Sequence, residues 1–223
     1  MIPVYNEEKT VGFVIESVKK LRSLYNVEII AIDDGSTDDS ANVIKKRGVR
    51  LLCNKRNMGK GAAIRKGLED ATGNIIVIQD ADLEYDPRLI PRLVEPIIAK
   101  RARVVYGSRF KGKCRGMKTV NRIGNIILSS ATSLLFKTKI TDMMTGYKAF
   151  TKEALENIKL TSKGFEFEPE ITAKIISRRV KILEVPIEYE GRGRGKKITW
   201  IDGLKSLVTL VKAFLRTTAN MTF

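Results

Sequence analysis

The chain has 223 residues, of which 43% are hydrophobic, so we expect one globular unit with a sizeable core rather than two full domains. Its 41 lysine and arginine residues outnumber its 25 aspartate and glutamate residues, giving a formal net charge of +16 and an expected preference for anionic partners. Histidine is absent, which excludes Ser/His and Cys/His catalysis, and Cys53 and Cys114 lack the spacing of a zinc site or a disulfide framework.

Strand and helix patterns alternate along the first half of the chain. In chain order they predict a helix over 11–21, a strand over 27–33, a helix over 41–47, a strand over 49–53, a helix over 58–71, a strand over 73–79, a helix over 87–100 and a strand over 103–108. Apolar strands that alternate with amphipathic helices indicate an α/β fold, with a mainly parallel sheet covered on both faces.

The last part of the chain, residues 191–223, has a different character. It begins with the basic, glycine-rich run GRGRGKK and continues into an expected amphipathic helix, so we separate it from a main domain over 1–190. Packing onto the main domain and contact with a membrane surface both fit such a helix. No window of the chain approaches the ~20 apolar residues of a membrane-spanning helix. The expected apolar face comprises Ile201, Leu204, Leu207, Val208, Val211, Phe214 and Leu215.

Carboxylates gather where two of the predicted strands end. Asp33 and Asp34 follow one strand, and Asp80 and Asp82 follow another. The carboxyl ends of parallel strands meet at one edge of a sheet, where ligands collect. Clustered carboxylates stay ionised when a cation joins them, and oxygen ligands favour Mg²⁺ or Mn²⁺. The alternative is that these aspartates form solvated turns, in which aspartate is common.

Six motifs in order along the chain carry a resemblance to a known family. They are IPVYNEE, DDGSTD, NMGKGAAIRKG, DADLEYDP, GSRF and TGYKAF. Together they resemble the family 2 glycosyltransferases with the GT-A (Rossmann-like) fold, and within that family the dolichol-phosphate mannose synthase group. The resemblance implies an inverting enzyme that uses a divalent metal ion. Such an enzyme would move a hexose from GDP-mannose or UDP-glucose to a polyprenyl (dolichyl) phosphate.

The resemblance also implies a donor site. Asp33 would bind the base or ribose, and Asp82 would be the most direct ligand of a metal ion that bridges the donor diphosphate. Glu84 stands where many polyprenyl-phosphate enzymes have glutamine, and with Asp80 and Asp82 it completes the expected metal ligands. The expected nucleotide-sugar-binding residues are Pro3, Tyr5, Asn6, Glu7, Asp33, Asp34, Lys60, Asp80, Ala81, Asp82 and Lys197.

Basic residues supply the expected acceptor site. In the resembling enzymes, arginines placed like Arg109 and Arg122 hold the acceptor phosphate, and a lysine placed like Lys197 reaches the donor diphosphate. With Asp82 these three residues form the expected catalytic group. A phosphate monoester has a second pKa of about 6 and needs no protein base near pH 7. Four further carboxylates fit either acceptor contact or structural support: Asp142, Glu166, Glu168 and Glu170.

The expected setting follows from these assignments. A basic amphipathic helix beside an anionic membrane surface suits a peripheral enzyme on the cytoplasmic membrane face. A family 2 transferase with a hydroxyl acceptor such as a polysaccharide is the first alternative. A nucleic-acid binder is a distant one, because the basic clusters lack interleaved aromatic residues, and we expect no nucleic-acid partner. Only Met1 and Ile2 precede the Pro3 motif, so we expect a very short first strand.

Overall fold

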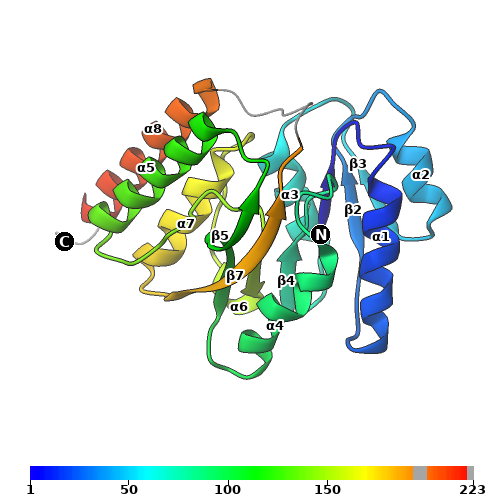
Figure 1. The fold of residues 1–223 in the computed structure, drawn as a ribbon, viewed down its shortest axis with the longest axis horizontal. Coiled ribbons are helices and arrows are strands. Elements are labelled where there is room, and N and C mark those ends of the chain that lie inside the picture. The colour runs from blue at the N-terminus through cyan, green and yellow to red at the C-terminus, as the bar shows by residue number, and fades with distance from the viewer. Residues whose placement is uncertain (193–199, 220–223) are drawn as a thin grey trace.

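The computed structural model describes residues 1–192 and 200–219, which form a sheet flanked by helices (Figure 1). The strands are β1 (Ile2–Val4), β2 (Ile30–Asp33), β3 (Arg50–Cys53), β4 (Ile75–Ile78), β5 (Val104–Arg115), β6 (Lys148–Thr151) and β7 (Ile182–Glu190). The α-helices are α1 (Val11–Lys19), α2 (Ser40–Lys46), α3 (Lys60–Asp70), α4 (Ile90–Ile98), α5 (Thr119–Leu135), α6 (Lys152–Leu155), α7 (Phe167–Ser177) and α8 (Trp200–Ala219). The 3₁₀ turns are η1 (Lys20–Ser23) and η2 (Pro87–Leu89).

The strands form two adjoining sheets. One has the order β1-β2-β3 and is parallel, and the other has the order β4-β6-β5-β7. Met1 joins them, because its amino group donates to the Val77 carbonyl at 2.8 Å and its carbonyl accepts from the Gln79 N–H at 3.0 Å. The predicted α/β architecture is confirmed, and β5 and β7 are parallel. The sequence did not reveal β6, which lies antiparallel between β4 and β5.

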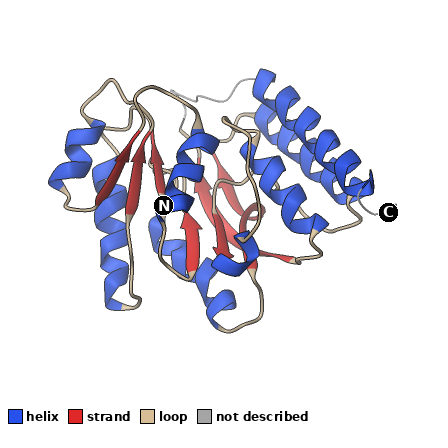
Figure 2. Cartoon of the chain, turned by 180° about the vertical axis from the view of Figure 1, so that it is seen from behind, coloured by secondary structure: helices blue, strands red, loops and turns tan. Residues whose placement is uncertain are grey.

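Alternate residues of the strands enter opposite cores. Ala31 packs in one cluster with side chains of α1 and α4, whereas its neighbour Ile32 packs with Ala63 of α3. The same alternation separates Val105 from Val104, which packs with residues of α7. Because successive strand side chains point to opposite faces, this pattern covers the sheet on both sides, as Figure 2 shows.

The structure confirms every helix and strand predicted up to residue 108, with shifted ends. The first strand is short, as expected. β5 extends seven residues beyond its predicted end at 108, because Lys113 to Arg115 pair with the last residues of β7. The helix α5 was not predicted.

The two longest helices, α5 and α8, lie side by side at one end of the molecule (Figure 1). On α8, Ser206 and Leu210 are buried, and the Phe214 ring meets the Phe136 ring with centroids 5.6 Å apart. Within residues 1–192 and 200–219, no helix has the length and apolar character needed to cross a membrane. The expected apolar face of α8 is therefore divided between packing on the main domain and exposure to solvent.

Candidate active site

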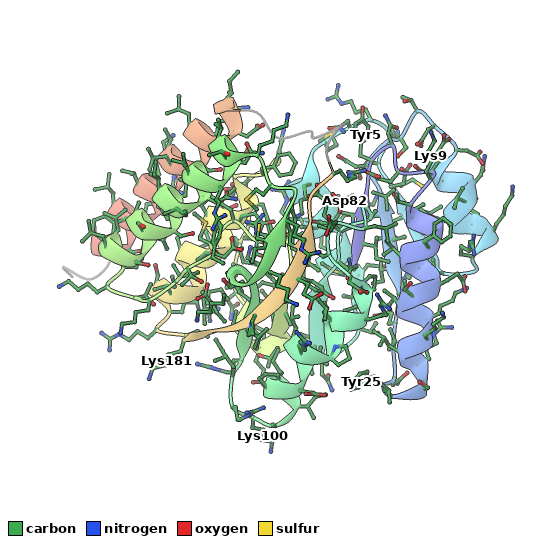
Figure 3. The ribbon with its side chains drawn as sticks, viewed as in Figure 1. Tyr5, Lys9, Tyr25, Asp82, Lys100 and Lys181 are labelled. Carbon is green, nitrogen blue, oxygen red and sulfur yellow. The ribbon has the colours of Figure 1, made fainter. Side chains whose placement is uncertain are left out.

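A cavity of about 680 Å³ opens at the carboxyl ends of β1 and β4. Figure 3 shows Tyr5 and Asp82 at this edge of the sheet, with Tyr25 and Lys100 at the opposite edge. The carboxyl edge is where open α/β sheets bind their ligands. Glu84 and Arg109 contribute to the lining. The expected nucleotide-sugar residues that line it are Pro3, Tyr5, Glu7, Asp34, Lys60, Asp80, Ala81 and Asp82.

Among the described residues, three expected site residues are not part of this lining. Asn6 accepts a hydrogen bond from the Thr37 N–H at 2.8 Å, and the buried Asp33 accepts one from the Ser36 N–H at 3.3 Å. Both side chains therefore shape the loop after β2. Arg122 lies exposed in the first turns of α5. Lys197 lies outside the described residues.

Asp80 is paired with a buried lysine. Lys60, at the start of α3, lies 2.8 Å from Asp80 and 3.1 Å from Glu168. Burial alone would lower the pKa of Lys60, but the two carboxylates outweigh it and raise that pKa above its ordinary value. Lys60 is therefore a permanent positive charge at the floor of the cavity.

Asp82 faces a different cation. Two nitrogens of Arg192 donate hydrogen bonds to the Glu7 carboxylate at 2.8 and 2.9 Å. One of them also lies 3.2 Å from Asp82 Oδ2. Burial and the neighbouring charges of Asp80 and Glu84 raise the pKa of Asp82 to about 7, against the opposing influence of Arg192. A positive charge next to Asp82 therefore relieves the repulsion among these carboxylates.

Glu84 has hydrogen-bond partners other than the two aspartates. Its carboxylate accepts from the Tyr189 hydroxyl at 2.6 Å and from the Arg192 backbone N–H at 2.8 Å. In the described part of the chain, no three aspartate, glutamate, cysteine or histidine side chains form a group that could hold a metal ion. These placements disfavour Glu84 as a third ligand. They fit an ion held by one or two aspartates and completed by substrate phosphates and water, as is usual for Mg²⁺.

A second buried lysine fixes Glu168. Lys148, on β6, is fully buried, pairs with Glu168 and donates to the Met143 carbonyl at 3.1 Å. Burial lowers the pKa of Lys148 despite the nearby Glu168 carboxylate. Glu168 both lines the cavity and orients Lys60, so it helps to position the charges beside Asp80.

Glu170 has a structural role at a distance from the cavity. It accepts from the backbone N–H groups of Thr161 and Ser162 and from the Lys174 side chain. Burial would raise the pKa of Glu170, but these hydrogen bonds lower it to about 2. Glu170 therefore ties the segment before α7 to that helix.

The glycines of NMGKG let another segment of the chain approach closely. A Cβ atom at Gly59 would lie 2.5 Å from the Lys163 carbonyl oxygen, and one at Gly61 would lie 2.6 Å from the Ser162 carbonyl oxygen. These two glycines therefore admit the chain's own segment before α7. Asp34 closes this loop by accepting from the Gly59 N–H at 2.7 Å.

Arg109 is held rigidly at the cavity. Its side chain makes two hydrogen bonds to the fully buried Asp142, at 2.7 and 2.6 Å, and its guanidinium lies 5.4 Å from the centroid of the Tyr189 ring. The Asp142 N–H in turn donates to Glu184 at 2.9 Å. Asp142 thus positions the arginine rather than facing the cavity lining.

Sequence reasoning missed Arg192, Tyr85 and Tyr189 as cavity residues. Arg192 was visible as the first basic residue of GRGRGKK, but nothing in that run distinguishes it from its neighbours. The two tyrosines resemble ordinary core residues, and their rings do pack together with centroids 5.3 Å apart. Only the crossing of β7 beside the loop after β4 brings them to the site.

Comparison with known proteins shows sequence similarity to one protein family and to individual members of it. The sequence profile described as "Glycosyl transferase family 2" matches residues 1–159. The chain is 31% identical to a UDP-N-acetylglucosamine–dolichyl-phosphate N-acetylglucosaminyltransferase of Methanococcus voltae, over 84% of this chain and 83% of that protein. It is 28% identical to a dolichol-phosphate mannosyltransferase of Pyrococcus furiosus, over 88% of this chain but only 57% of that longer protein.

A solved structure shares the fold. Glucosyl-3-phosphoglycerate synthase from Mycobacterium tuberculosis, crystallised with Mn²⁺, UDP-glucose and phosphoglyceric acid, matches with a TM-score of 0.78 and 22% identity. The match covers 96% of this chain and 78% of that one. The profile match spans well over half of the chain and the first relative is similar along most of its length. The chain therefore belongs to glycosyltransferase family 2.

Proposed function

We propose that the protein transfers a hexose from a nucleotide sugar, such as GDP-mannose or UDP-glucose, to a polyprenyl (dolichyl) phosphate. The observation that carries this proposal is a single cavity, in which the carboxylates that follow β4 share one lining with residues of α5 and α8. The lining runs from Asp80 and Asp82 to Val120 of α5 and Gly203 of α8. The names of the two archaeal relatives support a lipid phosphate acceptor.

The donor would bind over the carboxyl ends of β1 and β4. Asp82 and Asp80 would hold Mg²⁺ or Mn²⁺, and Lys60 pairs with Asp80 at 2.8 Å. When bound, such an ion neutralises the diphosphate that leaves the sugar. The M. tuberculosis enzyme, which shares the fold, was crystallised with Mn²⁺ and UDP-glucose, and this supports the assignment. Lys197 is proposed to reach the same diphosphate.

The acceptor would bring its own nucleophile. Because a phosphate monoester is largely ionised near pH 7, the chain need only align its oxygen with the anomeric carbon. Arg109, fixed by Asp142, and Arg122, at the exposed start of α5, are proposed to hold that phosphate. Attack from the side opposite the leaving diphosphate inverts the anomeric carbon.

An apolar surface continues from the cavity onto α5 and α8. Val120 lines the cavity and is also 76% exposed, so it belongs both to the cavity and to the exposed apolar surface. Contiguous exposed apolar side chains beside basic residues fit a lipid surface with anionic headgroups. We propose that this α5–α8 face rests on the cytoplasmic side of a membrane. Its exposed apolar residues are Val120, Ile123, Ile126, Ile127, Leu134, Ile201, Leu204, Val208, Val211 and Leu215.

Replacing Ile123 and Ile127 together by serine should weaken binding to anionic vesicles. Each side chain, if buried in lipid, contributes roughly 1.5–3 kcal/mol, so loss of two should lower the partition coefficient by at least ~10²-fold. Both residues are exposed, so the fold should be unaffected. Phe13→Ser, which removes an exposed apolar residue from α1, is the matched control for vesicle sedimentation. Equal binding of the double variant and the control would contradict a membrane role for this face.

Replacing Arg122 by glutamine should impair use of the acceptor and spare the donor. Loss of a charged hydrogen-bonding partner is worth roughly 1.5–3 kcal/mol, or about ten- to hundred-fold in acceptor kcat/KM. Arg101→Gln, an exposed arginine after α4, removes the same charge away from the cavity. Kinetics at fixed ionic strength should leave this control unchanged. Parent-like acceptor kinetics in Arg122→Gln would show that Arg122 does not hold the acceptor phosphate.

The proposed function is tested by a donor panel. GDP-mannose, UDP-glucose and UDP-N-acetylglucosamine are each incubated with Mg²⁺ or Mn²⁺ and a short polyprenyl phosphate, and lipid-linked sugar is detected by mass spectrometry. One donor should give a metal-dependent product whose phosphate carries the sugar. Absence of product with every donor would refute the proposal.

A further inference from the structure

Asp80 and Asp82 of DADLEYDP each face an internal cation, but the two cations are held differently. Lys60 is anchored on α3 by the buried Glu168, and its side chain is 13% exposed. Arg192 lies two residues beyond the end of β7, and its side chain is 31% exposed. Moving Lys60 would leave Glu168 without one of its two lysine partners inside the protein. Arg192 is therefore the cation that can leave its aspartate at lower cost.

The guanidinium of Arg192 contacts Asp82, the expected metal ligand. It bridges Glu7 and Asp82, with its two terminal nitrogens on Glu7 and one of them also on Asp82 Oδ2. A forked contact with a carboxylate is among the stronger charged hydrogen-bond arrangements. A divalent ion approaching Asp82 must either displace this guanidinium or bind against its positive charge.

We propose that Arg192 is a resident counter-ion that competes with a divalent metal ion for Asp82, so that the metal ion enters with the nucleotide diphosphate rather than alone. A diphosphate brings negative charge to the cavity, which attracts the metal ion and gives the displaced guanidinium a new anionic partner. The inference rests on the proposed function, since it assumes a nucleotide donor at this cavity.

Titration of the full chain with Mn²⁺ in the absence of nucleotide tests the competition. Free Mn²⁺, followed by electron paramagnetic resonance, should bind Arg192→Gln about tenfold or more tightly than the parent, because the competing charge is gone. Arg88→Gln, an exposed arginine that pairs with Asp86, is the control for overall charge and should match the parent. Adding Asp82→Asn to Arg192→Gln should abolish the gain. Saturating UDP or GDP should tighten Mn²⁺ binding far more in the parent than in Arg192→Gln.

Equal Mn²⁺ affinities of the parent and Arg192→Gln without nucleotide would overturn the inference, provided that thermal melting shows both to be folded. If the glutamine variant does not fold, Arg192→Lys serves instead. Lysine keeps the charge but loses the fork, so its Mn²⁺ affinity should exceed that of the parent, and an unchanged affinity would also overturn the inference. Failure of the donor site is distinguishable, because a parent that binds neither UDP nor GDP with Mn²⁺ contradicts the proposed function without affecting the nucleotide-free comparison.

Discussion

Replacing Asp82 by alanine is expected to lower kcat/KM for the acceptor by about 10²-fold or more. A loss of this size is typical when a major electrostatic stabiliser of the leaving group is removed. Asp82 lies at the edge of the cavity, where Arg192 and the neighbouring carboxylates define its charge. Steady-state kinetics with saturating metal ion and donor would measure the loss.

The control for this variant lies in the same motif. Asp86 does not line the cavity, and its carboxylate pairs with the exposed Arg88, so Asp86→Ala should retain activity close to that of the parent. Thermal melting should show that Asp82→Ala remains folded, because the residue lies in the turn after β4 and not in a core cluster. Normal turnover in folded Asp82→Ala would exclude Asp82 from the metal site.

Replacing Arg109 by leucine is expected to destabilise the protein by about 3–5 kcal/mol, because removing one partner of a buried ion pair leaves the other charge unpaired. Asp142 has no exposed surface and receives three hydrogen bonds from Arg109, one from the backbone and two from the side chain. Urea unfolding followed by circular dichroism would measure the change in the free energy of unfolding.

The double variant Arg109→Leu with Asp142→Leu is compared with the single variant Arg109→Leu. Replacement of both charges removes the unpaired carboxylate, so the double variant should be more stable than Arg109→Leu alone. Arg122→Gln, at an exposed position, should change the free energy of unfolding by no more than about 0.5 kcal/mol. A single Arg109→Leu variant as stable as the parent would show that the buried pair is not needed for the fold.

The alternation of strands and helices up to residue 108 could be predicted because it depends on local periodicity. Val11, Val14, Ile15 and Val18 repeat at helical spacing, and all four are buried on α1. The position of Asp80 and Asp82 at a strand end was also predictable, since parallel strands present their carboxyl ends at one edge.

The features that escaped prediction depend on contacts between distant parts of the chain. β5 continues to Arg115 only because β7 pairs with it, and β6 is a four-residue strand placed by its two antiparallel neighbours. Likewise, the partner of each cavity charge is set in three dimensions. Nothing local to DADLEYDP indicates that Lys60 would face Asp80 while Arg192 faces Asp82.

The glycines illustrate the same limit. Gly59 has a positive φ of 94° and faces the Lys163 carbonyl, a contact between segments about a hundred residues apart. The sequence indicates that small residues are needed at NMGKG but not which group approaches them. Both a donor phosphate and a neighbouring backbone place the same demand on the chain.

The choice of acceptor tests the central claim most directly. The parent protein is given one nucleotide sugar, Mn²⁺ and either a polyprenyl phosphate or the free polyprenol of the same chain length, and transfer of labelled hexose to lipid is measured. A chain without histidine that relies on an ionised phosphate nucleophile should glycosylate the phosphate and leave the alcohol untouched. Transfer to the alcohol at an equal rate, or transfer only to a soluble acceptor such as phosphoglyceric acid, would contradict the account.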